Sequence, residues 1–246
     1  MSITAFYHFF IPEDISKCLM SSMWIDEQLG CVVRSNLHTY ATINMHITMP
    51  VNFMYTPDIA MRDRLVKYIN LRYPFVNIIG IRSLQDENVY EGSTLSELYN
   101  HCLTNDGYVL YFHNKGMHST GIETTCWRQI LNHYMITEWK QCVNALQDYE
   151  ISCVSDIHVE NSEHAITSGN FWWARNTYIR TLQPPLSVED YAPNHVDPSI
   201  KRYAYELWLR KNTPSAWYIA HTKAWHYDTP IFLEAMLEGI DLARFH

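Results

Sequence analysis

One short polar turn has the residue types that bind phosphate. A run of strand-forming residues, 108–112, leads directly into His113, Asn114, Lys115 and Gly116. In open α/β sheets, ligands bind beyond the carboxyl ends of the strands, where the following loops diverge. A lysine ammonium supplies positive charge to a phosphate group, and a neighbouring glycine lets the backbone come close. The turn predicts a site for a phosphate-bearing ligand; the alternative is an ordinary hydrophilic turn after a buried strand.

A second cluster has residue types that suit a sugar. Ser168, Gly169 and Asn170 are followed after one residue by Trp172 and Trp173. Binding pockets combine a few placed polar groups with aromatic surface, and sugars present both hydroxyls and an apolar ring face. The alternative is that both indoles lie in the hydrophobic core. We expect one tryptophan to be buried and the other to line a sugar-binding cleft.

Two further groups are candidates for proton transfer or metal binding. Asp156 and His158 follow a predicted strand, and oxygen and imidazole ligands together suit manganese. Asp156 is equally interpretable as a lone general base or as a turn residue. Arg202 and Glu206 are four residues apart on a predicted helix, which is the spacing of a simple ion pair. The alternative role for Glu206 is a general base that deprotonates an acceptor hydroxyl.

The elements that position these residues alternate between strand and helix. Strands are predicted at 3–10, 39–48, 75–81, 108–112 and 149–155, and helices at 12–30, 57–68, 93–102 and 124–147. Such alternation favours an α/β fold with a mostly parallel sheet and helices on both faces. The remaining residues are rich in aromatics and proline. We therefore predict a single domain, 1–246, with a nucleotide-sugar-binding half (1–155) and an acceptor-side half (156–246) that lies over the sheet.

The overall composition excludes several classes of partner. The net charge is −8 and the pI is 5.9, which disfavours nucleic-acid binding. No apolar run approaches the roughly 20 residues of a transmembrane helix, and no secretory signal is visible. The six cysteines form no C-x-x-C pair and are expected to be mostly buried free thiols. These features predict a soluble protein in the cytoplasm.

Several familiar catalytic motifs are missing. The sequence contains no G-x-G-x-x-G, no Walker A lysine loop, no G-x-S-x-G and no H-E-x-x-H. Dehydrogenases, P-loop NTPases, α/β-hydrolases and zincins are therefore disfavoured.

An ordered set of blocks resembles a glycosyltransferase family of bacteria and large DNA viruses. The blocks are E-G-S-T-L at 91–95, Y-F-H-N-K-G at 111–116, W-R at 127–128, S-G-N-F-W-W-A at 168–174 with Tyr178, and R-x-x-x-E-x-W at 202–208. The resemblance covers residues 75–209. It implies a GT-A-like, Rossmann-like fold that uses a nucleotide sugar. It also implies that Glu91 and Thr94 lie on the nucleotide side.

The sequence departs from such folds at one position. A D-x-D strand end normally grips a metal ion and the diphosphate, whereas this strand ends in His113, Asn114 and Lys115 without a carboxylate. The departure implies that His113 and Lys115 neutralise the diphosphate leaving group as fixed charges, so that no cofactor is required. If Mn or Mg is used, Asp156 and His158 are the remaining ligands.

Together, the sequence features and the resemblance predict a glycosyltransferase that moves a sugar from a nucleoside diphosphate sugar to a hydroxyl of a glycan or other acceptor. Glu206 or Asp156 would be the base. The groups expected to bind sugar or acceptor are Ser168, Gly169, Asn170, Trp172, Trp173 and Arg202. Inversion and retention are both left open. The alternatives are a non-catalytic carbohydrate-binding protein, and a nucleotidyltransferase or sugar-nucleotide hydrolase. For a viral protein, the expected location is the host cytoplasm.

Overall fold

The computed structural model describes residues 2–11, 20–50, 56–84, 91–114, 122–158, 165–185 and 205–219. Of the predicted site residues, Lys115 and Arg202 lie outside these ranges, as does the side chain of His158. Everything stated below refers to the described part of the chain.

Strands and helices alternate through the first half of the chain, as predicted. The strands are β1 (Ile3–Phe10), β2 (Ala41–Pro50), β3 (Val76–Leu84), β4 (Tyr108–His113), β5 (Ile151–Cys153), β6 (Asp156–His158), β7 (Ala165–Thr167), β8 (Trp172–Arg175) and β9 (Ala216–Tyr218). The α-helices are α2 (Ser21–Arg34), α3 (Thr56–Arg72), α4 (Gly92–Thr104), α5 (Ile122–Leu131), α6 (Trp139–Ala145) and α7 (Asn176–Ile179). Short 3-10 turns cover Leu37–Thr39 and Ser168–Asn170, and a π-helical segment covers Asn132–Thr137.

The central sheet has the order β3-β2-β1-β4-β8-β5-β9. β3, β2, β1 and β4 are parallel to one another, and β5 is parallel to β9. β8 is antiparallel to both strands that flank it. β6 and β7 form a separate antiparallel pair. The fold is therefore a mixed α/β, Rossmann-like fold with a mostly parallel sheet, as the sequence predicts.

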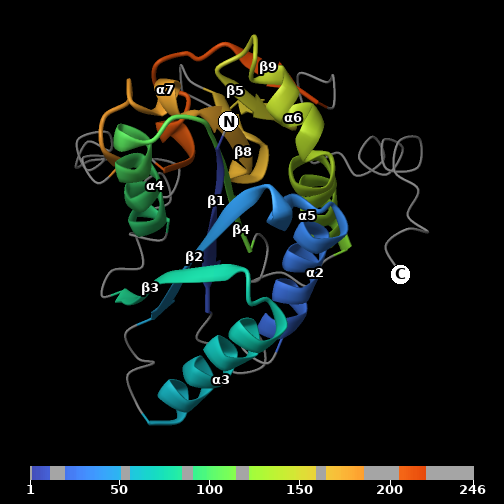
Figure 1. The fold of residues 1–246 in the computed structure, drawn as a ribbon, viewed down its shortest axis with the longest axis vertical. Coiled ribbons are helices and arrows are strands. Elements are labelled where there is room, and N and C mark those ends of the chain that lie inside the picture. The colour runs from blue at the N-terminus through green and yellow to red at the C-terminus, as the bar shows by residue number, and fades with distance from the viewer. Residues whose placement is uncertain are drawn as a thin grey trace.

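Helices cover both faces of this sheet (Figure 1). α4 and α7 lie on one side, here called the α4 face, and α2, α5 and α6 lie on the other, the α2 face. Successive strand residues alternate between the two. In β1, Tyr7 packs on the α2 face, whereas Phe6 packs on the α4 face. This alternation decides which polar side chains can meet.

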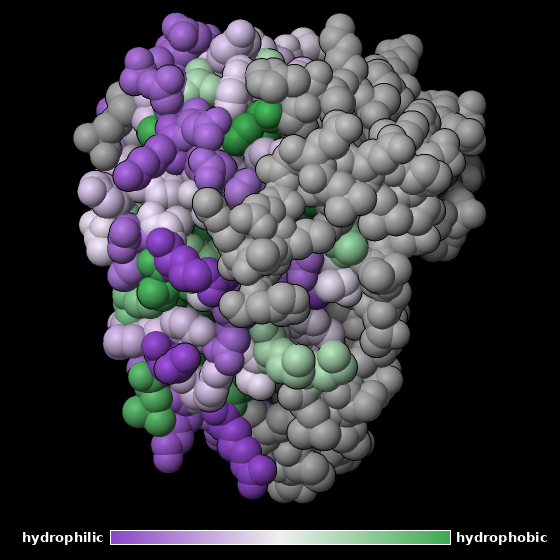
Figure 2. All heavy atoms as spheres, turned by 90° about the vertical axis from the view of Figure 1, so that its right-hand side faces the viewer, coloured by the Kyte–Doolittle hydropathy of each residue, from purple (hydrophilic) through white to green (hydrophobic). Residues whose placement is uncertain are grey.

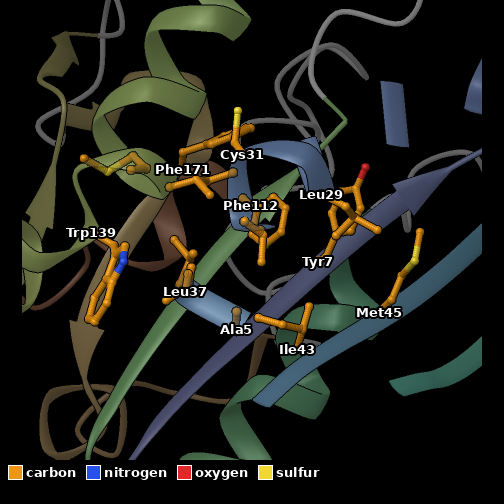
Figure 3. Close-up of a cluster of buried hydrophobic side chains, with 14 of the residues drawn as sticks. Ala5, Tyr7, Leu29, Cys31, Leu37, Ile43, Met45, Phe112, Trp139 and Phe171 are labelled. Atoms are coloured by element: carbon orange, nitrogen blue, oxygen red, sulfur yellow. The ribbon is translucent and has the colours of Figure 1, made fainter. Parts of the chain in front are cut away.

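The hydrophobic cluster on the α2 face is shown in Figure 3. Tyr7 stacks on Phe112 with 4.4 Å between ring centroids and 7° between ring planes. Its hydroxyl donates to Gln28 Oε1 at 2.7 Å, so the one polar atom in this stack is satisfied. Offset aromatic pairs of this kind add stability beyond their buried area. The stack ties the middle of β1 to β4.

The surface over this side is mostly polar. Figure 2 shows hydrophobic residues there in small separate groups. None of the described helices is both long and apolar enough to cross a membrane. Within the described ranges, Cys31, Cys102, Cys126, Cys142 and Cys153 are free thiols, and all but Cys126 are buried.

Three expectations about the elements were wrong. Gly30 does not end α2, which continues to Arg34 before Asn36 adopts a left-handed φ of 58°. Asparagine tolerates this conformation and can replace glycine beyond a helix end. The helix predicted at 124–147 is interrupted by the π-helical segment. The acceptor-side half does not simply lie over the sheet, because β8 and β9 are strands of it.

We expect Gly169→Ala to destabilise the fold. Gly169 has a φ of 63°, and a Cβ there would lie 2.4 Å from Leu131 Cδ1. Backbone strain and overpacking together should lower the free energy of unfolding by roughly 2–4 kcal/mol, which is measured by unfolding the protein with urea. The matched control is Gly30→Ala inside α2, where the new Cβ meets only the side chain of Arg34. The control should be neutral or stabilising by up to about 1 kcal/mol. Equal effects of the two substitutions would contradict this account.

Candidate functional site

The strand order reverses between β1 and β4, which makes their carboxyl ends the switch point of the sheet. Asn114 fixes the two ends together. Its Oδ1 accepts from the Phe10 amide at 3.0 Å, and its Nδ2 donates to the Phe10 carbonyl at 2.8 Å. Its own amide donates to the His8 carbonyl at 3.3 Å. The backbone at the start of the predicted phosphate-binding turn is therefore held rigidly.

Glu91, the N-cap residue of α4, is the centre of a polar network on the α4 face. Its Oε2 accepts from the Tyr111 hydroxyl at 2.9 Å and from the Asn170 side-chain amide. Its Oε1 lies 3.8 Å from His113 Nδ1. Asn170 Oδ1 in turn accepts from Trp172 Nε1 at 2.9 Å. The network connects a helix start, a strand and the turn before β8.

His113 is held from both faces of the sheet. Its Nε2 lies 2.8 Å from the Gly169 carbonyl. Because a carbonyl oxygen only accepts, Nε2 must carry a proton. Its Nδ1 faces the Glu91 carboxylate. From the α2 face, Gln28 Nε2 donates to the His113 carbonyl at 2.9 Å. Both ring nitrogens thus face acceptors of the protein itself.

The turn at 168–170 delivers two of these partners. Gly169 and Asn170 both have left-handed backbone conformations, with φ of 63° and 54°. Glycine and asparagine are the residues that adopt this region most readily. Ser168 accepts from Trp127 Nε1 through its hydroxyl at 3.2 Å, and its amide donates to the Ser155 carbonyl at 2.8 Å. The turn therefore bridges the carboxyl ends of β4 and β5.

Glu206 joins the same region. It is 5% exposed and lies in the helical residues 205–208. Burial raises the pKa of Tyr111 well above its usual value, and the charges of Glu91 and Glu206 raise it further. Gly92 permits Tyr205 to lie close to the start of α4, because a Cβ at position 92 would lie 2.7 Å from the Tyr205 hydroxyl. Two carboxylates therefore flank one buried tyrosine.

Sequence reasoning missed two histidines that lie beside this network. In the strand register His46, His8 and His113 are direct neighbours on β2, β1 and β4. The Thr94 hydroxyl lies 2.8 Å from His8 Nδ1 and 3.1 Å from His46 Nδ1. The available signal was that each histidine stands between two apolar residues within a strand, in F-Y-H-F-F and N-M-H-I-T.

Both of these histidines are buried, which disfavours their charged forms. Burial lowers the pKa of His8 well below its usual value, and the neighbouring His113 and His46 lower it further. Burial, together with the charge of Arg82, lowers the pKa of His46 to about 4. Both rings are therefore neutral at physiological pH and act as hydrogen-bonding groups.

Asp156 belongs to a different cluster. Its Oδ2 accepts from Arg210 Nη2 and from the Tyr218 hydroxyl. Its Oδ1 and Arg210 Nη1 are buried without a hydrogen-bond partner. Burial raises the pKa of Tyr218 to about 12, and the hydrogen bond to Asp156 acts in the same direction. Within the described ranges, no group of three or more acidic, histidine or cysteine side chains is arranged to hold a metal ion.

The expectation that one tryptophan lines a cleft was wrong. Trp172 and Trp173 are both fully buried, and they pack on opposite faces because they are adjacent in β8. Trp172 stacks on Tyr111 at 5.3 Å, whereas Trp173 Nε1 donates to the Met135 carbonyl at 2.8 Å. Neither ring presents a face to solvent.

The structure thus brings together many, but not all, of the predicted site residues. One network contains Glu91, His113, Gly169, Asn170 and Trp172, and Glu206 lies near it, where its charge acts on Tyr111. Thr94 is fully buried beside it, and Ser168 supports its turn. Asp156 and Trp173 have other partners. A buried imidazole beside carboxylates can hold and move a proton, which is the chemical capacity of this arrangement.

We expect the buried histidines to make stability depend on pH. The pKa of His46 is about 4 in the folded protein, against about 6.5 in the unfolded chain. Between these two pH values, the unfolded chain binds a proton that the folded chain does not. The stability is present above pH 6.5 and is lost as the pH falls toward 4. In urea unfolding at pH 7.5 and 5, His46→Asn should reduce this loss by on the order of 1–2 kcal/mol. An unchanged pH dependence in the variant would contradict the assignment.

Comparisons with known proteins give a family but no activity. No curated protein sequence matches the chain significantly. Similar solved structures include 4-diphosphocytidyl-2C-methyl-D-erythritol synthase from Anaerococcus prevotii DSM 20548, with a TM-score of 0.40, 10% identity and 96% of each chain covered. A second structure of a synthase of that name has a TM-score of 0.40 and 9% identity, covering 94% of this chain and 97% of its own. HddC from Yersinia pseudotuberculosis has a TM-score of 0.40 and 10% identity, covering 97% and 99%.

Structural likeness with a TM-score and a sequence identity as low as these carries no information about activity. The family model described as a domain of unknown function, DUF8361, matches residues 6–219. This match runs from β1 to the end of β9 and so spans most of the chain. The chain therefore belongs to the DUF8361 family.

Proposed function

We propose that this protein is a glycosyltransferase that moves a sugar from a nucleoside diphosphate sugar to a hydroxyl acceptor. The observation that carries the proposal is the convergence on Glu91. Side chains from positions 111, 113 and 170 gather around it at the switch point of the sheet, and Glu206 lies near Tyr111. Ligands of open α/β sheets bind at such points.

The convergence favours a catalyst over a carbohydrate-binding module. A module needs hydroxyl partners and an aromatic platform, but Trp172 and Trp173 are fully buried. A carbohydrate-binding module has no need of buried charged side chains. Here the carboxylates of Glu91 and Glu206 both lie near the buried Tyr111, despite the cost of removing charged groups from water. Charged groups concentrated in this way are typical of functional sites.

The roles divide according to what each group contacts. Lys115 follows the clamped end of β4 in the sequence and supplies the positive charge for the leaving diphosphate. His113 faces Glu91 and the Gly169 carbonyl, so we assign it to orienting this end of the site. Glu206 is the proposed base. Asp156 is the less favoured base, because one of its oxygens already accepts from Arg210 and Tyr218.

A donor screen tests the activity. Thermal unfolding would be followed with UDP-, GDP- and dTDP-sugars, each with and without Mn²⁺, because a ligand that binds the folded state raises its melting temperature. One nucleotide class should stabilise the protein without metal. Stabilisation only with Mn²⁺ would point instead to a metal-bound donor at Asp156 and His158. No shift with any donor would overturn the proposal.

Reaction products would then separate the enzyme classes. With the stabilising donor and a panel of sugar acceptors, a glycosyltransferase releases nucleoside diphosphate only as the sugar is transferred. A hydrolase would consume the donor without an acceptor. With pyrophosphate added, a nucleotidyltransferase would instead transfer the nucleotidyl group to it, which gives a nucleoside triphosphate and a sugar phosphate.

Lys115→Ala should lower turnover strongly. Removing one fixed charge that stabilises the leaving group typically costs roughly 10²–10³-fold in kcat. The melting temperature should stay close to that of the unmodified protein. The matched control is Lys140→Ala on the exposed side of α6, which should retain full activity. Equal turnover in the Lys115 and Lys140 variants would exclude the proposed role.

A further inference from the structure

The hydroxyl of Thr94 links the first turn of α4 to strands β1 and β2 of the sheet. Thr94 is fully buried, and its Oγ1 lies within hydrogen-bonding distance of both His8 and His46. A hydroxyl has one proton, so at least one of the two rings must donate to it. On the far side of His8, Nε2 lies 3.3 Å from Thr48 Oγ1. The result is a continuous chain of hydrogen bonds across β2 and β1.

His46 is itself positioned by a glycine on the neighbouring strand. A Cβ at Gly80 would lie 2.3 Å from His46 Cδ2, so the ring lies directly over the backbone of β3. The register of β2 and β3 shifts between Met45 and His46, which brings Gly80 opposite His46. Only a residue without a side chain allows the ring this position.

Thr94 lies one helical turn from Glu91. The Leu95 amide donates to the Glu91 carbonyl at 3.0 Å, which closes the first turn of α4. The Glu91 side chain makes no cap for its own helix and instead reaches Tyr111, Asn170 and His113. A shift of this turn would therefore move the carboxylate relative to His113.

We propose that Thr94 is a positioning residue: with His8 and His46 it fixes the first turn of α4, so that the Glu91 carboxylate faces His113. The geometric part of this inference does not depend on any activity. Its consequence for turnover rests on the proposed glycosyltransferase function.

Thr94→Val tests the role, because valine keeps the shape and removes the hydroxyl. The readout is the NMR pH titration of the His113 ring, which senses the neighbouring titratable groups Glu91, His8 and Tyr111. Glu206 lies near Tyr111. If the Glu91 carboxylate moves away, the titration midpoint should fall by about one pH unit, since a nearby opposite charge favours the protonated ring. Thr94→Ser keeps the hydroxyl and should restore the original midpoint.

Gly80→Ala provides a second route that leaves Thr94 intact. The new methyl group would push the His46 ring from its place and should shift the His113 midpoint in the same direction. If Thr94→Val and Gly80→Ala fold but leave the midpoint unchanged, the positioning role is overturned and Thr94 serves stability alone.

Turnover separates this inference from the proposed function. With an active donor, Thr94→Val should reduce kcat roughly tenfold to hundredfold with little change in KM, since small misplacements in a site carry costs of this size. If the midpoint shifts but the unmodified protein transfers no sugar from any donor, the positioning role stands and the proposed function fails.

Discussion

A carboxylate removed from water must be surrounded by groups that replace its hydration, and this requirement organises the α4 face. Glu91 satisfies it with the Tyr111 hydroxyl, the Asn170 amide and the nearby His113 ring. These partners come from β4 and from the turn before β8. Leaving such a charge unpaired would cost several kcal/mol. The start of α4, the end of β4 and the left-handed turn at 168–170 must therefore form together.

The sheet separates this polar network from the main core without isolating it. Tyr7 and Phe112 stack on the α2 face, one residue away in each strand from His8 and His113 on the α4 face. Gln28 connects the two from the α2 face, because it accepts from Tyr7 and donates to the backbone carbonyl of His113. Gln28 Nε2 also donates to Oδ1 of Asn132, in the π-helical segment, at 3.2 Å. Irregular helical turns of this kind recur at functional sites, and here the irregularity faces the back of the switch point.

The strand–helix alternation was predictable because β-branched, aromatic and turn residues are local signals. The placement of His113 at the end of a strand and of Glu206 on a helix was also predictable from local pattern, whereas the helix start at Glu91 was expected two or three residues later. The mutual contacts of the site residues were not predictable, since these depend on β8 entering the sheet beside β4. The burial of Trp172 and Trp173 follows from the same insertion, which places one indole in each face. The role of His8 and His46 was hidden because a histidine within an apolar strand gives no sign of its partner.

The position of β8 also has a consequence for the order in which the chain can fold. β8 lies between β4 and β5, although β5 precedes it in the sequence. Strands β3, β2, β1 and β4 can pair in turn as the chain proceeds, each next to a strand already in place. β5 and β9 have no path into the sheet until residues 172–175 have inserted beside β4. Closing the long chain segment between β4 and β8 carries an entropic cost before any pairing compensates for it. The growing sheet therefore exposes the open edge of β4 until a late segment covers it, and this edge is the part of the protein most exposed to mispairing during synthesis.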